Sequence, residues 1–230
     1  MDASPSNCEP KADYLLSDCP EGCLEGVKDA ITPSNSPTTL NIFLTHHHAD
    51  HTAGLDEVLE WAASRETLDV KVRTHANCPV STTLPSSLDI ESIVTHGHTE
   101  DHKCFYAPAL NTLVSGDALF SMGCGRVFTG DMDAAYEGLQ NLKAQVADDA
   151  LVLCSHEYTA SNGAFCLSLG EEFWGKDWAA VRERVEDVTK LRAQNLPTIG
   201  TSFKQEKLWN PFLRVDRAEF ERIRKLKDSF

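Results

Sequence analysis

The segment Thr45–Leu55 reads THHHADHTAGL, and its position in the chain decides how the rest is interpreted. It directly follows Leu40–Thr45 (LNIFLT), a nearly continuous apolar run that predicts a short strand buried on both faces. Beyond it, apolar residues recur at helical spacing and predict a helix over Leu55–Glu66. The segment therefore lies where a buried strand turns into a helix.

This turn brings together side chains that bind metals. His46 and His48 lie two residues apart, so their rings point the same way on extended backbone. Asp50 and His51 follow where the chain must turn. Neutral imidazole and carboxylate groups suit zinc, iron or manganese. Four such side chains at one strand end predict a metal site.

Three more candidate ligands follow later predicted strands: His98 in THGHTEDH, Asp117 in LVSGDALF and His156 in LVLCSHEYT. Ligands from several strand ends that meet at one edge of a sheet are typical of α/β enzymes. The seven candidates exceed what one four-coordinate ion needs. We therefore expect two ions that share one carboxylate.

Further elements divide the chain into an α/β body and a mostly helical tail, with the boundary near residue 157. The predicted strands are 70–74, 92–95, 103–106, 112–115 and 151–154, and the predicted helices are 133–147, with Asp133 as N-cap, and 216–227. Helical spacing also runs from Trp178 to Leu191. Residues 1–12 are polar and are expected to be disordered.

Composition narrows the function classes. The net charge of −14 argues against binding to nucleic-acid phosphates, and no apolar run approaches the roughly 20 residues of a membrane helix. The start does not resemble a signal peptide, and the eight cysteines contain no CxxC pair. We read them as reduced thiols of a cytoplasmic protein. Residues 204–230 carry a net charge of +3, which is typical of an anion site or of a solvated helix face.

The motifs HxHxDH, GHT, SGD and SHEY, in this order, resemble the metallo-β-lactamase superfamily. Within it, four stretches resemble the hydroxyacylglutathione hydrolase (glyoxalase II) family: LFSMGCGRVFTGD (119–131), SHEYTASN (155–162), NPFLRV (210–215) and IRKLKDSF (223–230). The resemblance implies an α/β fold, an αββα sandwich followed by a C-terminal helical domain. We expect a metal-binding catalytic domain over residues 1–157 and a glutathione-binding domain over 158–230.

The resemblance also implies a ligand set for two divalent ions, with zinc favoured and iron or manganese possible alternatives. His46, His48 and His98 would hold one ion, Asp50, His51 and His156 the other, and Asp117 would bridge them. The implied reaction converts S-D-lactoylglutathione to glutathione and D-lactate, the second step of methylglyoxal detoxification. We expect a hydroxide between the metals as nucleophile, with Asp50 and Asp117 as the catalytic carboxylates.

The family links Arg126, Tyr158, Arg224 and Lys227 to the glutathione moiety. Glutathione carries two carboxylates, which an acidic protein must hold with fixed cations. Phe128 stands where the family usually has tyrosine, and we include it among the substrate-binding residues.

Little predicted structure precedes Asp18, so we expect the first sheet to have shortened N-terminal strands. This leaves a catalytically silent or impaired homologue open as an alternative function. A persulfide dioxygenase of the same superfamily is another, although it lacks the GCGR loop and the helical tail. We expect a monomer.

Overall fold

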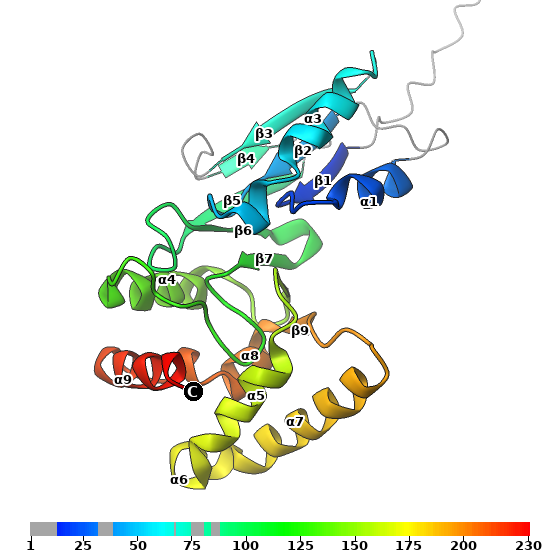
Figure 1. The fold of residues 1–230 in the computed structure, drawn as a ribbon. Coiled ribbons are helices and arrows are strands. Elements are labelled where there is room, and N and C mark those ends of the chain that lie inside the picture. Colours follow the sequence, from blue (N-terminus) through cyan, green and yellow to red (C-terminus); the bar gives the residue numbers. More distant parts are fainter. Residues whose placement is uncertain (1–12, 32–38, 67, 75–80, 84–87) are drawn as a thin grey trace, which may run out of the picture.

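The computed structural model describes residues 13–31, 39–66, 68–74, 81–83 and 88–230. Two sheets lie face to face, and helices cover their outer faces (Figure 1). The predicted αββα sandwich is thereby confirmed. The predicted disorder of residues 1–12 lies outside the described residues, as do Cys8, His75 and Cys78. None of the described helices is long and apolar enough to span a membrane.

The first sheet has three parallel strands in the order β1-β2-β3: β1 (Asp13–Ser17), β2 (Thr39–Phe43) and β3 (Asp69–Arg73). Every residue of β2 is buried, as the apolar run predicts. Leu40 and Ile42 pack on one side with Val27 of α1 (Cys23–Ala30) and Val58 of α3 (Leu55–Ala63). Phe43 belongs to a separate cluster with residues of the second sheet.

The second sheet has six strands in the order β4-β5-β6-β7-β8-β9. They are β4 (Ser81–Thr83), β5 (Asp89–Val94), β6 (Lys103–Ala107), β7 (Thr112–Gly116), β8 (Leu151–Cys154) and β9 (Thr201–Ser202). Neighbours are antiparallel except β7 and β8, which are parallel. This parallel pair ends beside the candidate site and brings Asp117 and His156 to one edge.

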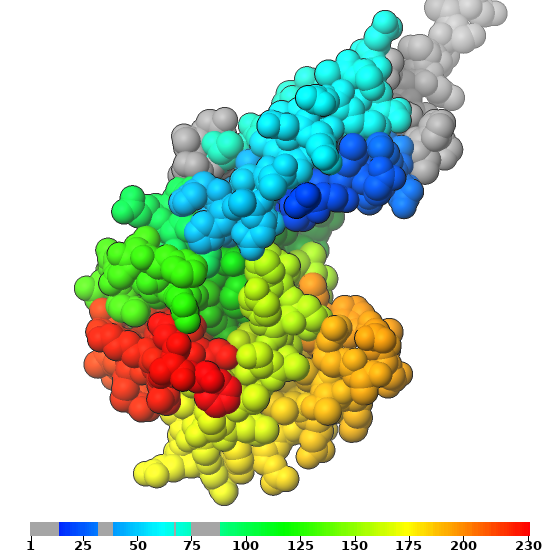
Figure 2. Space-filling view, in the orientation of Figure 1, coloured from blue at the N-terminus to red at the C-terminus, as the bar shows by residue number. Residues whose placement is uncertain are grey.

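The remaining described helices are α2 (Ala49–Thr52), α4 (Met132–Gln145), α5 (Thr159–Ser168), α6 (Gly170–Trp174), α7 (Trp178–Ala193), α8 (Phe203–Trp209) and α9 (Arg217–Asp228). Short 3₁₀ segments occupy Pro108–Leu110, Gly175–Asp177 and Pro211–Leu213. From α5 onward these helices gather below the second sheet, and Figure 2 shows them as one mass against it.

One sequence expectation needs correction, and three strands were not predicted. The N-cap of α4 is Asp131, whose carboxylate accepts a hydrogen bond from the Ala134 N–H, and not Asp133, which lies inside the helix. Among the described residues, the one strand that precedes Asp18 is β1, a five-residue edge strand that pairs with β2 and was not predicted. The strands β4 and β9 were not predicted, since each has only two or three residues.

The helical tail shares its core with the body of the protein. Phe203, Phe212 and Phe220 from the tail are buried in one cluster with Leu113 and Leu139 of the body. The strand β9 of the tail also pairs with β8 of the second sheet. The two parts therefore share one core cluster, although the tail also forms a smaller cluster around Trp174 and Val181 with Met122.

A fully buried carboxylate fastens the tail to the segment after β7. Glu206 of α8 accepts hydrogen bonds from Ser121 Oγ (3.0 Å), Met122 N (2.9 Å) and Thr201 Oγ1 (2.5 Å). The Asn210 side-chain amide lies 3.4 Å away. Burying a charge in this way is tolerable because several donors surround it.

We expect Glu206→Ala to lower the free energy of unfolding by about 3 kcal/mol, because it leaves several buried donors without an acceptor. Chemical denaturation would measure this loss, with the same dependence of the free energy of unfolding on denaturant concentration used for both proteins. Glu219→Ala, at a half-buried surface carboxylate paired with Arg222, is the matched control and should cost about 0.5 kcal/mol or less. Equal losses for the two variants would show that the buried network does not stabilise the fold.

Candidate metal centre and substrate pocket

The seven predicted ligands come from four separate places in the chain and meet at one end of the two sheets. His46 and His48 follow β2, and Asp50 and His51 belong to the short helix α2. His98, Asp117 and His156 follow β5, β7 and β8 respectively. The structure brings all seven together, as expected.

Among the described residues, the ligand atoms form two separate groups that are each compact enough to hold a metal ion, and a third group, His46, His51 and Asp117, overlaps both. Of the two separate groups, one is His46, His48 and His98, and the other is Asp50, His51 and His156. In the first, His48 Nδ1 lies 3.1 Å from His46 Nε2 and 3.2 Å from His98 Nε2. In the second, Asp50 Oδ2 lies 3.4 Å from His156 Nε2 and 3.7 Å from His51 Nε2.

Asp117 stands between the two groups, with one oxygen toward each. Its Oδ2 is 3.5 Å from His98 Nε2, and its Oδ1 is 3.5 Å from both His51 Nε2 and His156 Nε2. Asp117 Oδ1 and His51 Nε2 are buried and have no hydrogen-bond partner. Buried polar atoms rarely lack a partner, so their convergence is the observation that fits a divalent metal ion.

Asp18, at the end of β1, holds the second group from behind. Its carboxylate accepts hydrogen bonds from Thr45 N (2.8 Å) and lies 2.9 Å from His51 Nδ1. With Nδ1 engaged in this way, the Nε2 atom of His51 faces Asp117. An outer carboxylate that orients a histidine is a common support for metal ligands. The sequence shows only an acidic residue before a cysteine here, so Asp18 was not among the predicted site residues.

The first group has outer partners of a different kind. His98 Nδ1 lies 2.9 Å from the carbonyl oxygen of Arg126, and His46 Nδ1 lies 3.0 Å from Thr45 Oγ1. His102 Nε2 accepts a hydrogen bond from the Asp117 backbone N–H at 3.0 Å. His102 therefore positions Asp117 and does not belong to either ligand group.

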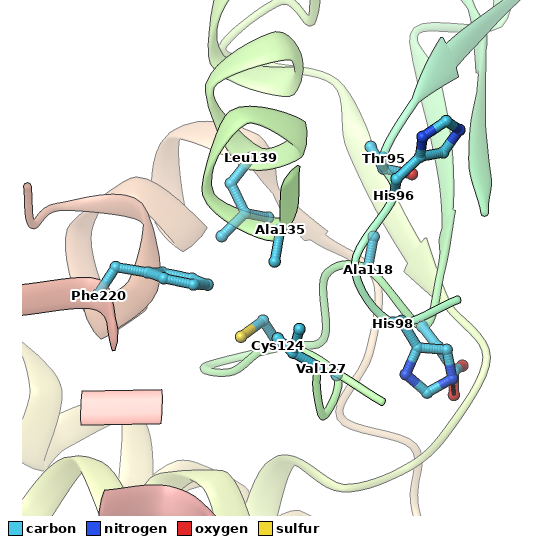
Figure 3. Close-up of a pocket in the computed structure, with 11 residues that line it drawn as sticks. Thr95, His96, His98, Ala118, Cys124, Val127, Ala135, Leu139 and Phe220 are labelled. Atoms are coloured by element: carbon cyan, nitrogen blue, oxygen red, sulfur yellow. Dashed lines mark ion pairs between the residues drawn. The ribbon is translucent and has the colours of Figure 1, made fainter. Parts of the chain in front are cut away.

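Packing closes the back of the site. Figure 3 shows the His98 ring at one side of a cavity that Cys124, Ala135 and Phe220 line on the other. The cavity measures about 10 Å³, which leaves room for at most about one water molecule.

Electrostatics separate the roles of the histidines. Burial, together with neighbouring imidazoles, lowers the pKa of His46 and lowers that of His102 to about 3, so both rings are neutral. Burial also acts to lower the pKa of His51, but the carboxylates of Asp117 and Asp18 beside its two ring nitrogens outweigh it and raise the value to about 10. A positive charge is thus stabilised beside these two carboxylates. A metal cation would be stabilised there for the same reason.

A cavity of about 650 Å³ opens in front of the two groups. It is lined by the predicted substrate residues Arg126, Phe128 and Tyr158, together with ligands from both groups. The Phe128 side chain is 61% exposed, which leaves it accessible to a bound molecule. Tyr158 stacks on His156 with ring centroids 4.9 Å apart.

The other two predicted substrate residues do not line this cavity. Arg224 is 4% exposed, and its Nη1 donates a hydrogen bond to the carbonyl oxygen of Cys124 at 2.7 Å. Lys227 Nζ lies 3.4 Å from the carbonyl oxygen of Ser161. Asp228 joins Arg224 and Arg126, with its Oδ1 at 3.0 Å from Arg224 Nη2 and 3.2 Å from Arg126 Nε. Arg224 therefore contacts the loop that carries Arg126.

Comparison with known proteins places the chain first in a superfamily. The metallo-beta-lactamase superfamily matches residues 61–156. Among solved structures, the chain is similar to ETHE1 from Myxococcus xanthus (TM-score 0.61, 22% identity, 93% of this chain and 80% of that one). It is also similar to the BLEG-1 B3 metallo-beta-lactamase (TM-score 0.56, 20% identity, 88% and 90%). At these identities the likeness shows the fold alone.

Sequence relatives define the particular family. The family described as "Hydroxyacylglutathione hydrolase C-terminus" matches residues 157–230. The chain is 36% identical to the hydroxyacylglutathione hydrolase of Bartonella henselae over 93% of this chain and 89% of that protein. It is 36% identical to the enzyme of the same name from Shewanella pealeana over 78% of this chain and 68% of that protein. The chain belongs to the hydroxyacylglutathione hydrolase family.

We expect Asp18→Ala to reduce the metal content of the purified protein, because the ring of His51 loses the carboxylate that orients it. Loss of an outer partner typically weakens metal binding by about 10–100-fold. Elemental analysis after dialysis against a weak chelator would measure the metal retained per chain. Asp187→Asn, an exposed carboxylate paired with Lys190, should retain the wild-type content. Unchanged retention in Asp18→Ala would exclude this supporting role.

Proposed function

We propose that the chain hydrolyses S-(2-hydroxyacyl)glutathione thioesters, with S-D-lactoylglutathione giving glutathione and D-lactate. The observation that carries the proposal is the position of Asp117, whose two oxygens face two separate ligand groups at the floor of a cavity lined by Arg126. Family membership supports the same reaction. The site thus combines groups for activating water with a cation that can hold a substrate carboxylate.

The residues fit two divalent ions, and we assign them accordingly. His46, His48 and His98 would hold one, and Asp50, His51 and His156 the other, with Asp117 shared between them. Imidazole and carboxylate donors favour zinc, and also accept iron or manganese. When bound, such ions supply Lewis acidity and allow water to act as a nucleophile near neutral pH.

The chain's own residues then orient the reactants. The Asp50 carboxylate is largely exposed and lines the cavity, so it can accept a proton from the attacking water. The water oxygen bonds to the acyl carbon as the carbon–sulfur bond breaks. The leaving thiol has a reference pKa near 8.5, so it departs as thiolate without a dedicated general acid.

We assign the glutathione moiety to Arg126, Phe128 and Tyr158, because all three line the cavity. The Arg126 guanidinium can bind a carboxylate with two parallel hydrogen bonds. Direct contacts from Arg224 and Lys227 stay predictions. The position of Arg224 gives it a second role, since it holds the backbone that precedes Arg126.

In this proposal residues 1–157 form the catalytic domain and 158–230 the domain that supports glutathione binding. The protein acts as a cytoplasmic monomer.

The decisive test is release of glutathione thiol from S-D-lactoylglutathione by metal-loaded protein. We expect turnover in the wild type and a loss of at least about 100-fold in Asp117→Ala, since outer-partner losses alone reach that size. Asp187→Asn should keep wild-type activity. A protein that binds two metals but hydrolyses no thioester would support the silent homologue. Oxygen uptake with a glutathione persulfide would instead support the dioxygenase.

We expect Arg126→Gln to raise KM for S-D-lactoylglutathione about tenfold, with kcat within about twofold of wild type. A hydrogen bond to a charged group contributes about 1.5–3 kcal/mol, and the exposure of this side chain favours the lower end. Arg222→Gln removes an exposed arginine of α9 and should leave both constants unchanged. A fall in kcat with constant KM would contradict a role in substrate binding.

A further inference from the structure

The end of α9 meets the loop that carries Arg126, and one carboxylate joins the two. Asp228, the last residue of α9, lies four positions after Arg224 and therefore on the same face of the helix. Its Oδ1 accepts hydrogen bonds from Arg224 Nη2 (3.0 Å) and from Arg126 Nε (3.2 Å). The backbone oxygen of Asp228 also lies 3.4 Å from Arg126 Nη2. A single residue thus contacts two nitrogens of the Arg126 guanidinium.

Arg224 fixes the position of this carboxylate. The Arg224 side chain is 5% exposed, and its guanidinium lies 5.1 Å from the centroid of the Phe212 ring. Its Nη1 donates to the carbonyl oxygens of Cys124 (2.7 Å) and Gly125 (3.4 Å). In the part of the chain that the structure describes, Asp228 is the only ion-pair partner of Arg224. Moving Asp228 away would leave a buried charge unpaired, so the carboxylate stays where Arg224 holds it.

These contacts close a ring around the loop. Arg126 directly follows Gly125, so the loop that accepts hydrogen bonds from Arg224 also supplies the guanidinium that donates to Asp228. The third guanidinium nitrogen of Arg126, Nη1, makes no hydrogen bond to the described residues, and Arg126 lines the cavity of about 650 Å³ in front of the candidate ligands. The ring therefore holds one edge of the guanidinium and leaves Nη1 for a bound molecule.

Charge and geometry make opposite demands on Asp228. A carboxylate 3.2 Å from Arg126 offsets part of the positive charge that would attract an anion. However, the Arg126 side chain is 55% exposed, and without a partner it would sample many rotamers. Immobilising such a side chain when a ligand binds lowers the affinity by about 2- to 12-fold, and a guanidinium that is already held avoids this loss.

We propose that Asp228 is a positioning residue for substrate binding, which holds the Nε edge of Arg126 so that Nη1 meets a carboxylate of the glutathione moiety. This inference rests on the proposed function, which assigns that moiety to Arg126. Asp228 does not line the cavity and acts through Arg126. Orientation outweighs the charge of Asp228, because the positive charge of Arg224 already balances it.

The first experiment measures kcat and KM for S-D-lactoylglutathione with metal-loaded Asp228→Asn. We expect KM to rise about fivefold because the guanidinium is no longer held, with kcat within about twofold of wild type. An unchanged KM would overturn the proposal. A lower KM would also overturn it, by showing that Asp228 competes with the substrate for Arg126. Glu221→Gln is the matched control, because Glu221 pairs with Arg217 and Lys225 on the same helix and should leave KM unchanged.

A double-mutant cycle separates positioning from a general effect on the fold. In the Arg126→Gln background no guanidinium is left to orient, so Asp228→Asn should change KM by less than about twofold. A rise of about fivefold in both backgrounds would show that Asp228 acts through the fold and would overturn the proposal.

A second variant serves if Asp228→Asn does not fold, since removing one partner of a buried ion pair destabilises a protein. Asp228→Glu keeps the counter-charge of Arg224 and moves the carboxylate outward by one methylene, away from Arg126 Nε. We expect circular dichroism to show a folded protein whose KM is raised about threefold. Wild-type KM in folded Asp228→Glu would contradict the positioning role.

A binding measurement keeps this inference separate from the proposed function. S-Methylglutathione is a thioether that cannot be hydrolysed, and calorimetry with metal-loaded protein should give a Kd about fivefold higher for Asp228→Asn than for wild type. If the wild type hydrolyses S-D-lactoylglutathione but both proteins bind the thioether equally, the positioning role is wrong and the proposed function stands. If Asp228→Asn weakens thioether binding but the wild type hydrolyses no thioester, the positioning role stands and the proposed function fails.

Discussion

The site depends on crowding several imidazole rings around one buried carboxylate. The ring of His46 has its centroid within 5.0 Å of those of His48, His51, His98 and His102. Such a cluster cannot carry a proton on every ring, because like charges in a buried position repel strongly. Burial keeps His46 and His102 neutral, and hydrogen bonds fix each ring's direction. The strand ends hold these rings against one another.

Sequence reasoning predicted the parts of this arrangement that rest on local geometry. The alternation of His46 and His48 after an apolar run forces both rings toward one side, whatever the rest of the fold does. Burial of β2 on both faces also followed from its composition. The spacing of Trp178 to Leu191 predicted α7 because a helix repeats over many residues. Elements of two or three residues, such as β9, carry no such repeat.

Contacts between distant residues were beyond the same reasoning. Asp18 and His51 are 33 positions apart, and Arg224 and Cys124 are 100 apart. The presence of a carboxylate or guanidinium in the sequence does not predict which distant atom it will bind. For this reason the contact of Arg224 with the loop carbonyls was not predicted, and its expected contact with substrate stays a prediction. The choice of Asp133 over Asp131 as N-cap was a local error instead, because both aspartates stand within two residues of each other at the start of the helix.

The loop from Phe120 to Arg126 shows why the helical tail and the site belong together. The Asn210 amide donates to the carbonyl oxygens of Phe120 and Gly123, and Arg224 donates to that of Cys124. Gly125 lies so close to Asp117 that a Cβ would stand 2.1 Å from its carbonyl oxygen. The tail thus presses the loop against the residue shared by both ligand groups. Because Arg126 follows directly, movement of the tail would shift Arg126 and Asp117 together.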